Sequence, residues 1–214
     1  MDNVILNSYS KIPFLNVSRE TCSELEILIS MIQKKNREIN IISKRNNEKN
    51  SIRERHIIDS AQVIDFVDLN SNTTSDLGTG GGMPGLITAI AMKKIKNTMK
   101  INLYEKSYNK CVFLKDVSKK LNLNTEIIHK DIFKVKNIKT GTIMSRAFKP
   151  MPVILNLVNE NFTKFRNIIF FMGSTGRKIL DESLKHWDLD YEEKKSITSE
   201  DSFILNIKKI HKKN

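Results

Sequence analysis

Cysteine, proline and tryptophan are scarce in this chain of 214 residues, which has two cysteines, four prolines and one tryptophan. The cysteines, Cys22 and Cys111, lie far apart, and no Cys-x-x-Cys pair is present, so a disulfide scaffold and a structural zinc site are both disfavoured. No run approaches the roughly 20 apolar residues that cross a bilayer, and the first 15 residues lack the apolar segment of a signal peptide. We therefore expect a cytoplasmic protein with no metal site and no membrane partner.

Acidic residues are outnumbered by basic ones. Asp and Glu total 24 against 36 Lys and Arg, which gives a net charge of +12 and a pI near 9.6. Clustered Lys and Arg release counterions when they neutralise phosphates, so this excess favours a polyanionic partner such as nucleic acid. The chain is also rich in Lys, Asn and Ile throughout, and a compositional bias alone produces the same charge. Charge by itself leaves both interpretations open.

Glycine is rare too, yet five of the eight glycines fall within residues 78–85. Asp76 precedes this loop, and an apolar, helix-compatible run follows it at 86–92. Such spacing indicates a tight turn that a ligand approaches more closely than a Cβ atom would allow, as nucleotide-type ligands do at a helix N-terminus. Pro84 suits the first turn of that helix, because its missing N–H would be unpaired there anyway. The loop therefore predicts a cofactor site.

Hydrophobic periodicity divides the chain into two parts. Apolar residues at helical spacing predict an amphipathic helix over 18–40, with Ser18 as N-cap, and a second helical segment over 52–67. Short strand-like runs then alternate with helical ones, with strands expected at 73–77, 100–105, 126–129, 142–145, 167–172 and 203–208. This alternation predicts an α/β fold, in which a mostly parallel sheet has helices on both faces and binds ligands at the carboxyl ends of its strands. We expect a helical extension over 1–70 and the α/β domain over 71–214.

The first expected strand is unusual, because residues 72–75 are more polar than a buried central strand should be.

The glycine loop is compatible with two cofactors. Gly80-x-Gly82-x-x-Gly85 matches the dinucleotide fingerprint, and Glu105, about twenty residues further on, could take ribose hydroxyls. S-adenosylmethionine is the alternative, with Asp76 and the loop holding its amino-acid end and Glu105 its ribose. A carboxylate at the position of Asp76 would repel a pyrophosphate but attract an α-ammonium group, which favours S-adenosylmethionine over NAD.

Four segments together carry a family resemblance: Arg-His-Ile-Ile-Asp-Ser at 55–60, the glycine loop at 76–85, Lys-Cys-Val-Phe-Leu at 110–114 and Ser-Arg-Ala-Phe at 145–148. In this order they resemble the signatures of the RsmG family, the bacterial 16S ribosomal RNA guanine-N7 methyltransferases formerly called glucose-inhibited division protein B. The similarity runs from about residue 25 to the final expected strand. It implies a Rossmann-like class I methyltransferase fold, S-adenosylmethionine as cofactor, and as substrate a guanine of 16S ribosomal RNA near the decoding centre.

The resemblance also implies site residues. Cofactor contacts fall on Gly78, Met83 and Arg146, and the adenine is expected beside Asp131 and Ile132. Asn36 and Asn40 match the asparagines of a family helix end in which Lys35 replaces a tryptophan. The candidate catalytic residues are Arg146, Asn40 and His56. The spacing of the glycine loop and of the acidic residues around it adds four residues to the expected cofactor site: Asp76, Gly80, Gly82 and Glu105. Cys111 departs from the family pattern, because an arginine is common at that position.

The expected chemistry needs no catalytic base, because guanine N7 carries a free lone pair and positioning and electrostatics supply the rate. His56 and Arg55 are both spaced to pair with Asp59 on a helix surface. The expected partner is 16S ribosomal RNA or the small ribosomal subunit, with the protein acting as a monomer. Two other functions remain open at this point: a NAD-dependent oxidoreductase and a non-catalytic RNA-binding ribosome-assembly factor.

Overall fold

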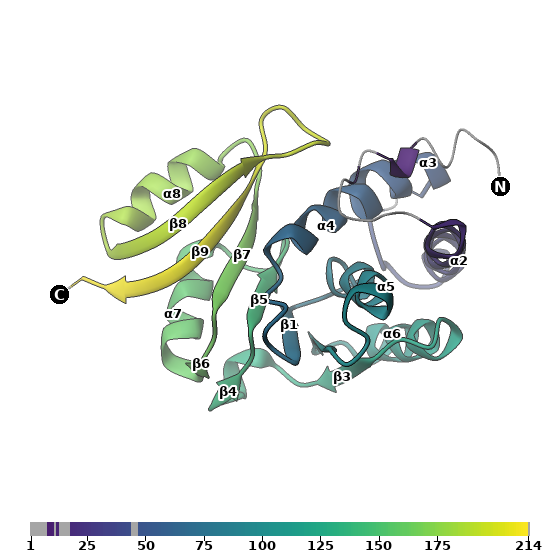
Figure 1. Ribbon diagram of the computed structural model, residues 1–214, viewed down its shortest axis with the longest axis horizontal. Helices are drawn as coiled ribbons and strands as arrows, with labels where there is room; N and C mark the ends of the chain where they lie inside the picture. Colours follow the sequence, from purple (N-terminus) through teal and green to yellow (C-terminus); the bar gives the residue numbers. More distant parts are fainter. Residues whose placement is uncertain (1–7, 11, 13–17, 44–46, 214) are drawn as a thin grey trace.

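A seven-stranded sheet forms the centre of the protein (Figure 1). The computed structural model describes residues 8–10, 12, 18–43 and 47–213. The strand order is β3-β2-β1-β5-β7-β9-β8, and the strands pair in parallel except that β9 runs antiparallel to both of its neighbours. The strands are β1 (Thr73–Leu77), β2 (Lys100–Glu105), β3 (Thr125–His129), β5 (Thr142–Ser145), β7 (Asn167–Met172), β8 (Trp187–Lys195) and β9 (Phe203–Lys212). A separate two-stranded sheet pairs β4 (Ile138–Lys139) with β6 (Phe162–Lys164).

All six strands expected from the sequence are present, four of them with the expected bounds. The main strand that the sequence reading missed is β8. It forms one edge of the sheet, and its residues alternate between half-buried and exposed, with charged side chains on the exposed side. Charged edge strands are common because they discourage pairing with other chains. They also lack the apolar run that marks a buried strand, which explains why β8 gave no signal.

The helical extension differs in detail from the expectation. The first helix, α2 (Arg19–Lys35), is five residues shorter at its end than expected, and it begins as expected after Ser18, whose Oγ accepts a hydrogen bond from the Thr21 N–H at 3.2 Å. The second is one helical run of changing type rather than a uniform α-helix. It consists of α3 (Lys49–Ile52), the π-helical η2 (Arg53–Ile58), α4 (Asp59–Ala61) and the 3₁₀-helical η3 (Gln62–Phe66). π-Helical turns are rare and often lie at functional sites.

Helices cover both faces of the sheet, as expected. Side chains of β2 alternate between two cores, with Ile101 and Leu103 in one and Tyr104 in the other. The first core contains α2, α5 (Gly85–Ile95) and α6 (Tyr108–Lys120), and the second contains α7 (Met151–Asn161) and α8 (Gly176–Leu184). In Figure 1 the two groups of helices lie on opposite sides of the sheet. The short η4 (Ile132–Lys134) follows β3.

The extension completes the first of these faces. Val63 of η3 packs on Met144 of β5, Ile169 of β7 and Ile204 of β9, all of which are essentially inaccessible to solvent. Without η3, this half of the sheet would present apolar side chains to water. The expected boundary near residue 70 therefore separates elements that share one packed interior, and the division of the chain at that point remains a prediction.

The polar start of β1 is accommodated by hydrogen bonds. Thr74 and Ser75 are fully buried, and their hydroxyls reach the Met99 sulfur at 3.4 Å and the Thr140 hydroxyl at 3.1 Å. A buried hydroxyl is tolerated when it has such a partner. β1 is thereby a central strand despite its composition. Among the described residues, no helix combines the length and apolar character needed to cross a membrane.

Candidate active site

The glycine loop joins the end of β1 to the start of α5. Gly78 and Gly80 have φ angles of +65° and +57°, in the left-handed region that residues with a Cβ rarely adopt. Pro84 immediately precedes the first residue of α5, which confirms the predicted helix start. A Cβ added to Gly80 would meet no heavy atom closer than 3.8 Å, so this side of the loop is open. The loop therefore presents bare backbone to the space above it.

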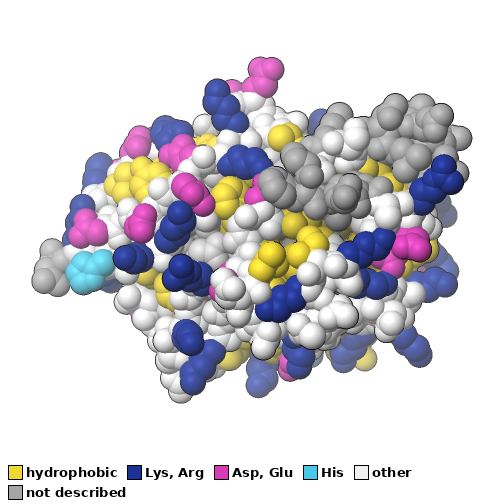
Figure 2. Space-filling view, viewed as in Figure 1, with side chains coloured by type: hydrophobic (Ala, Val, Ile, Leu, Met, Phe, Trp, Pro, Cys, Tyr) yellow, Lys and Arg dark blue, Asp and Glu magenta, His cyan; other side chains and the backbone are white. Residues whose placement is uncertain are grey.

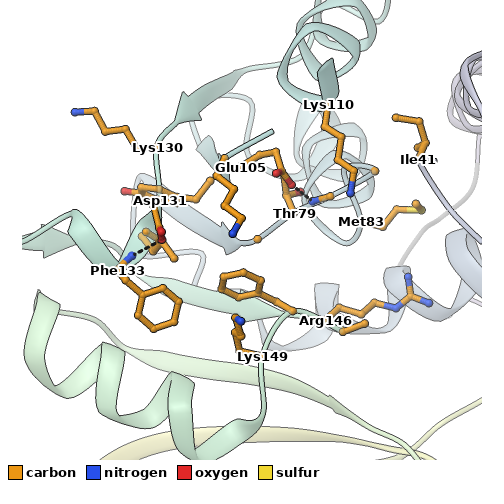
Figure 3. A pocket seen from close by; sticks show the side chains of 18 of the residues that line it. Ile41, Thr79, Met83, Glu105, Lys110, Lys130, Asp131, Phe133, Arg146 and Lys149 are labelled. Carbon is orange, nitrogen blue, oxygen red and sulfur yellow. Dashed lines mark hydrogen bonds between the residues drawn. The ribbon is translucent and has the colours of Figure 1, made fainter. Parts of the chain in front are cut away.

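That space is a cavity of about 770 Å³ at the carboxyl edge of the sheet (Figure 3). It lies over β1 and β5, between which the strand order reverses, and over the neighbouring ends of β2 and β3. Open α/β sheets bind their ligands at such reversal points. Of the site residues expected from the sequence, the following line the cavity: His56, Gly78, Gly80, Met83, Glu105, Asp131, Ile132 and Arg146.

Asp76 does not line the cavity, contrary to the expectation that it would face the ligand. Its side chain is fully buried beneath the loop, where Oδ2 accepts hydrogen bonds from the Thr79 hydroxyl at 2.6 Å and the Gly85 N–H at 2.8 Å. Burial raises the pKa of this carboxyl group to about 6, although both hydrogen bonds oppose the shift. Asp76 therefore braces the two ends of the glycine loop, and its contribution to a ligand is indirect.

Gly82 is likewise absent from the cavity lining. A Cβ at this position would lie 2.1 Å from Leu86 Cδ1, and the residue has a φ of +90°. It permits close packing of the loop on α5 instead of contact with a ligand.

Glu105 ties the loop to the start of α6. Its Oε2 accepts a hydrogen bond from the Gly80 N–H at 3.0 Å, which is drawn in Figure 3, and its Oε1 accepts one from the Ser107 N–H at 2.7 Å. An ionised carboxylate has about four lone-pair positions, so acceptor capacity remains on both oxygens. Glu105 is thus fixed in place and still able to accept hydrogen bonds from hydroxyl groups in the cavity.

Arg146 points from the end of β5 toward the helical extension. Its Nε and Nη2 lie 3.1 and 3.0 Å from Asp59 Oδ2, and Nη2 also donates to the Arg55 carbonyl at 2.7 Å. Nη1 lies 3.4 Å from His56 Nδ1. A guanidinium has five N–H donors, and three of them make hydrogen bonds here, while Nη2 is also in ion-pair contact with Asp59. One Nη1 donor remains for a ligand.

His56 is held as a neutral imidazole. Burial lowers its pKa to about 4, and the positive charges of Arg146 and Arg55 act in the same direction. Because the guanidinium of Arg146 can only donate, the facing Nδ1 is the acceptor and the proton resides on Nε2. Nε2 is buried and has no hydrogen-bond partner among the described residues. An unsatisfied buried donor is costly, which makes this N–H a candidate for binding a ligand acceptor.

Asn40 does not reach the cavity and is exposed, whereas Asn36 is buried. Asn36 Oδ1 accepts hydrogen bonds from the backbone N–H groups of Ile41 and Ile42 at 2.9 and 3.0 Å. Both isoleucines line the cavity. Of the two asparagines that match the family pattern, Asn36 therefore shapes one wall of the site.

Sequence reasoning missed several lining residues. Phe148 lies against Gly78, where an added Cβ would be 2.0 Å from its ring, and Phe133 packs beside Phe148 with 6.2 Å between ring centroids. Phe148 belongs to the Ser-Arg-Ala-Phe segment, which carried the family resemblance but gave no indication that Phe148 lines the cavity. No sequence pattern marked Phe133, because η4 is a single short turn.

Four lysines also line the cavity: Lys106, Lys110, Lys130 and Lys149. None of them forms an ion pair with a described residue, unlike Lys93, Lys94 and Lys208 elsewhere. In Figure 3, Lys110 extends from α6 and Lys130 from the segment that follows β3. Over the face drawn in Figure 2, by contrast, basic side chains are widely spread with acidic ones among them. Basic side chains therefore outnumber the two carboxylates, Glu105 and Asp131, in the cavity lining.

Comparison with known proteins identifies the family. The sequence model of the family described as rRNA small subunit methyltransferase G matches residues 21–207. The chain belongs to this family. A ribosomal RNA small subunit methyltransferase G from Pelagibacter ubique is 56% identical over 210 residues, which covers 98% of this chain and 99% of the relative. A protein of the same name from Rickettsia akari is 31% identical over 198 residues, covering 92% of this chain and 99% of the relative.

Solved structures confirm the fold class. A SAM-dependent methyltransferase from Aquifex aeolicus superposes with a TM-score of 0.54 at 12% identity, over 71% of this chain and 89% of that one. A SAM-dependent O-methyltransferase from Thermotoga maritima gives a TM-score of 0.53 at 16% identity, over 81% and 74%. At these identities the likeness establishes the architecture, which is the Rossmann-like class I methyltransferase fold.

Proposed function

We propose that this protein transfers a methyl group from S-adenosylmethionine to N7 of a guanine in 16S ribosomal RNA, near the decoding centre. The observation that carries the proposal is the meeting of the glycine loop, Glu105 and Arg146 at one cavity, in a chain of the rRNA small subunit methyltransferase G family. The family gives the class of substrate, and the resemblance of the four motifs supports the guanine N7 position.

The lining suits S-adenosylmethionine. The open side of Gly80 leaves room where a Cβ would intrude, and Glu105 has free acceptor positions for ribose hydroxyls. The half-buried Asp131 and the buried Ile132 follow β3 at the same edge, in place to contact an adenine ring. The cofactor brings an electrophilic methyl group on a sulfonium. Asp76 contributes by fixing the loop from below.

The residues around Arg146 suit methylation of a ring nitrogen. N7 has a free lone pair, so no proton has to be removed and the protein needs only to position and polarise the base. The remaining Nη1 donor of Arg146 suits an acceptor such as the guanine O6, and the Nε2 donor of neutral His56, on the side of the ring away from Arg146, suits a second acceptor. With a pKa near 4, His56 acts in this proposal as a hydrogen-bond donor and not as a base.

The alternatives differ in what they bind. A NAD-dependent oxidoreductase is not favoured, because the family is one of methyltransferases. A non-catalytic assembly factor would bind RNA without binding S-adenosylmethionine. Isothermal calorimetry with S-adenosylmethionine and with NAD separates the three functions. A methyltransferase should bind S-adenosylmethionine and not NAD, an oxidoreductase should bind NAD, and an assembly factor requires neither.

The decisive experiment maps 7-methylguanosine in ribosomal RNA by mass spectrometry, in cells with and without the gene. We expect one 16S fragment to lose its methyl group in the deletion strain and to regain it when the gene is restored. Purified protein with labelled S-adenosylmethionine should then methylate the same fragment in either naked 16S RNA or small subunits from the deletion strain. An unchanged methylation pattern in the deletion strain would refute the proposal.

A further inference from the structure

Tyr108 is the most exposed large hydrophobic side chain among the described residues, with 68% of its surface accessible. It is the first residue of α6, three positions after Glu105, and it is not part of the cavity lining. Its ring contributes little to the core, so its exposure is not explained by the packing of the fold. Exposed aromatic side chains next to a nucleic-acid site are stacking surfaces for unpaired bases.

The ring of Tyr108 is held beside that of His129. The two centroids are 6.0 Å apart, and the rings are inclined at 58°. His129 ends β3, directly opposite Glu105 in the register of β2 and β3, and its Nε2 lies 3.1 Å from the Lys106 carbonyl oxygen. His129 is therefore fixed at the end of β3 and Tyr108 at the start of α6, both at the carboxyl edge of the sheet. The pair forms a preorganised aromatic surface immediately outside the cavity.

Positive charge adjoins this surface. Lys106 and Lys130 flank the two aromatic residues in the sequence, both are exposed, and neither forms an ion pair with a described residue. Among the nearby carboxylates, Glu105 accepts two backbone hydrogen bonds and Asp131 accepts one from the Phe133 N–H. Neither pairs with a lysine among the described residues, and Glu126 pairs with Lys100 at 3.4 Å. Aromatic faces interleaved with free lysines are the arrangement that binds single-stranded RNA, by base stacking and phosphate contact together.

We propose that Tyr108, His129, Lys106 and Lys130 form a platform for a single-stranded segment of the substrate RNA, in which an unpaired base stacks on Tyr108. This inference rests on the proposed function, because it places the RNA next to the methylated guanine. The two lysines contact phosphates on either side of the stacked base. The platform lies next to the cofactor end of the cavity, so it holds nucleotides that flank the guanine and not the guanine itself.

The test uses a synthetic single-stranded RNA containing 2-aminopurine, whose fluorescence is quenched by stacking, and a duplex of the same sequence. Tyr108→Ala should weaken binding of the single strand by about tenfold and abolish the quenching, while Tyr108→Phe should bind as the wild type does. Leu69→Ala removes another exposed apolar side chain, before β1 at the opposite edge of the sheet, and should change nothing. Because Tyr108 is so exposed, its substitution should leave the thermal midpoint unchanged.

The lysines are tested by the salt dependence of binding. Lys106→Ala and Lys130→Ala should each reduce the slope of log affinity against log salt by about 1, as expected for one lost phosphate contact. Lys120→Ala, at the far end of α6, removes the same charge and should leave the slope unchanged.

Three outcomes overturn the platform: wild-type RNA affinity in Tyr108→Ala, an equal loss of duplex binding, or a matching loss of affinity for S-adenosylmethionine by calorimetry. The last would assign the ring to the cofactor site. A wild-type protein that methylates 16S RNA while Tyr108→Ala binds RNA normally refutes only the platform. A wild-type protein that binds the single strand through Tyr108 but transfers no methyl group refutes only the proposed function.

Discussion

Asp59 Oδ2 lies 3.0 Å from Arg146 Nη2, across 87 residues of sequence. The other carboxylate oxygen of Asp59 accepts hydrogen bonds from the Thr198 hydroxyl at 2.7 Å and the Gln62 amide at 3.1 Å. The helical extension, the end of β5 and the loop between β8 and β9 therefore meet at one carboxylate. The helix spacing predicted that Asp59 would pair locally with Arg55 or His56. Its side chain instead bonds to Arg146 and Thr198, which lie far from it in the sequence.

Arg146→Ala should lower methyl transfer by roughly 2–4 kcal/mol of transition-state stabilisation, by analogy with the removal of one preorganised donor. Arg146→Lys should restore only part of this, because the charge remains while the planar fork is lost. The measurements are the single-turnover rate and the thermal midpoint of the same purified variants.

Thr198→Val serves as the matched control, because it removes one hydrogen bond to Asp59 and leaves Arg146 intact. It should lower the thermal midpoint by a few degrees and change the rate much less than Arg146→Ala does. If Arg146→Ala is destabilised but turns over normally in its folded fraction, Arg146 is a structural brace for Asp59 and has no part in the chemistry.

Gly80→Val should abolish binding of S-adenosylmethionine while leaving the overall fold in place. The branched side chain would enter the open space above the loop, and the φ of +57° adds local strain. Gly173→Val is the control, since a Cβ there meets nothing within 4 Å and the residue lies outside the cavity lining. Calorimetry gives the affinities and circular dichroism the fold. Wild-type affinity in Gly80→Val would refute the assignment of this loop.

RNA affinity should fall by about tenfold or more between roughly 50 and 200 mM salt, if several of the free lysines around the cavity contact phosphates. Each phosphate contact releases condensed counterions, so the slope of log affinity against log salt counts the contacts. Fluorescence anisotropy with a fragment of 16S RNA measures it. A flat profile would indicate that the net charge of +12 reflects composition alone.

His56 should titrate near pH 4, well below the ordinary histidine pKa of about 6.5, in a proton NMR titration of the imidazole signals. A histidine whose pKa is depressed by folding contributes stability that is fully present above about pH 6.5 and is lost as the pH falls toward 4. His56→Asn should therefore be less acid-sensitive than the wild type in this window, by about 1–2 kcal/mol after allowance for partial solvent exposure. An ordinary titration midpoint for His56 would contradict its role as a neutral donor.

The fold and much of the cavity were predictable from the sequence because their signals are local. Apolar runs marked the buried strands other than β1, and the alternation of strands with helical segments gave the parallel sheet and placed the ligand site at its carboxyl edge. The glycine loop and Glu105 could be located for the same reason, since the loop follows the strand expected at 73–77 and Glu105 ends the strand expected at 100–105. β8 was not predicted, because an edge strand needs no apolar run.

Other features depend on which groups the folded chain brings together. Asp76 reads as a ligand-facing carboxylate, but closure of the loop places the Gly85 N–H and the Thr79 hydroxyl on it and buries it completely. The sequence places Arg146 at a strand end with its donors available. In the folded chain its guanidinium instead bonds to Asp59 and to the Arg55 carbonyl, both in the helical run that precedes β1. The sequence by itself determined the architecture and the position of the cofactor loop, because periodicity and backbone conformation are encoded within a few residues. Only the tertiary structure decided which polar groups face the cavity, because hydrogen bonding and burial depend on residues far apart in the chain.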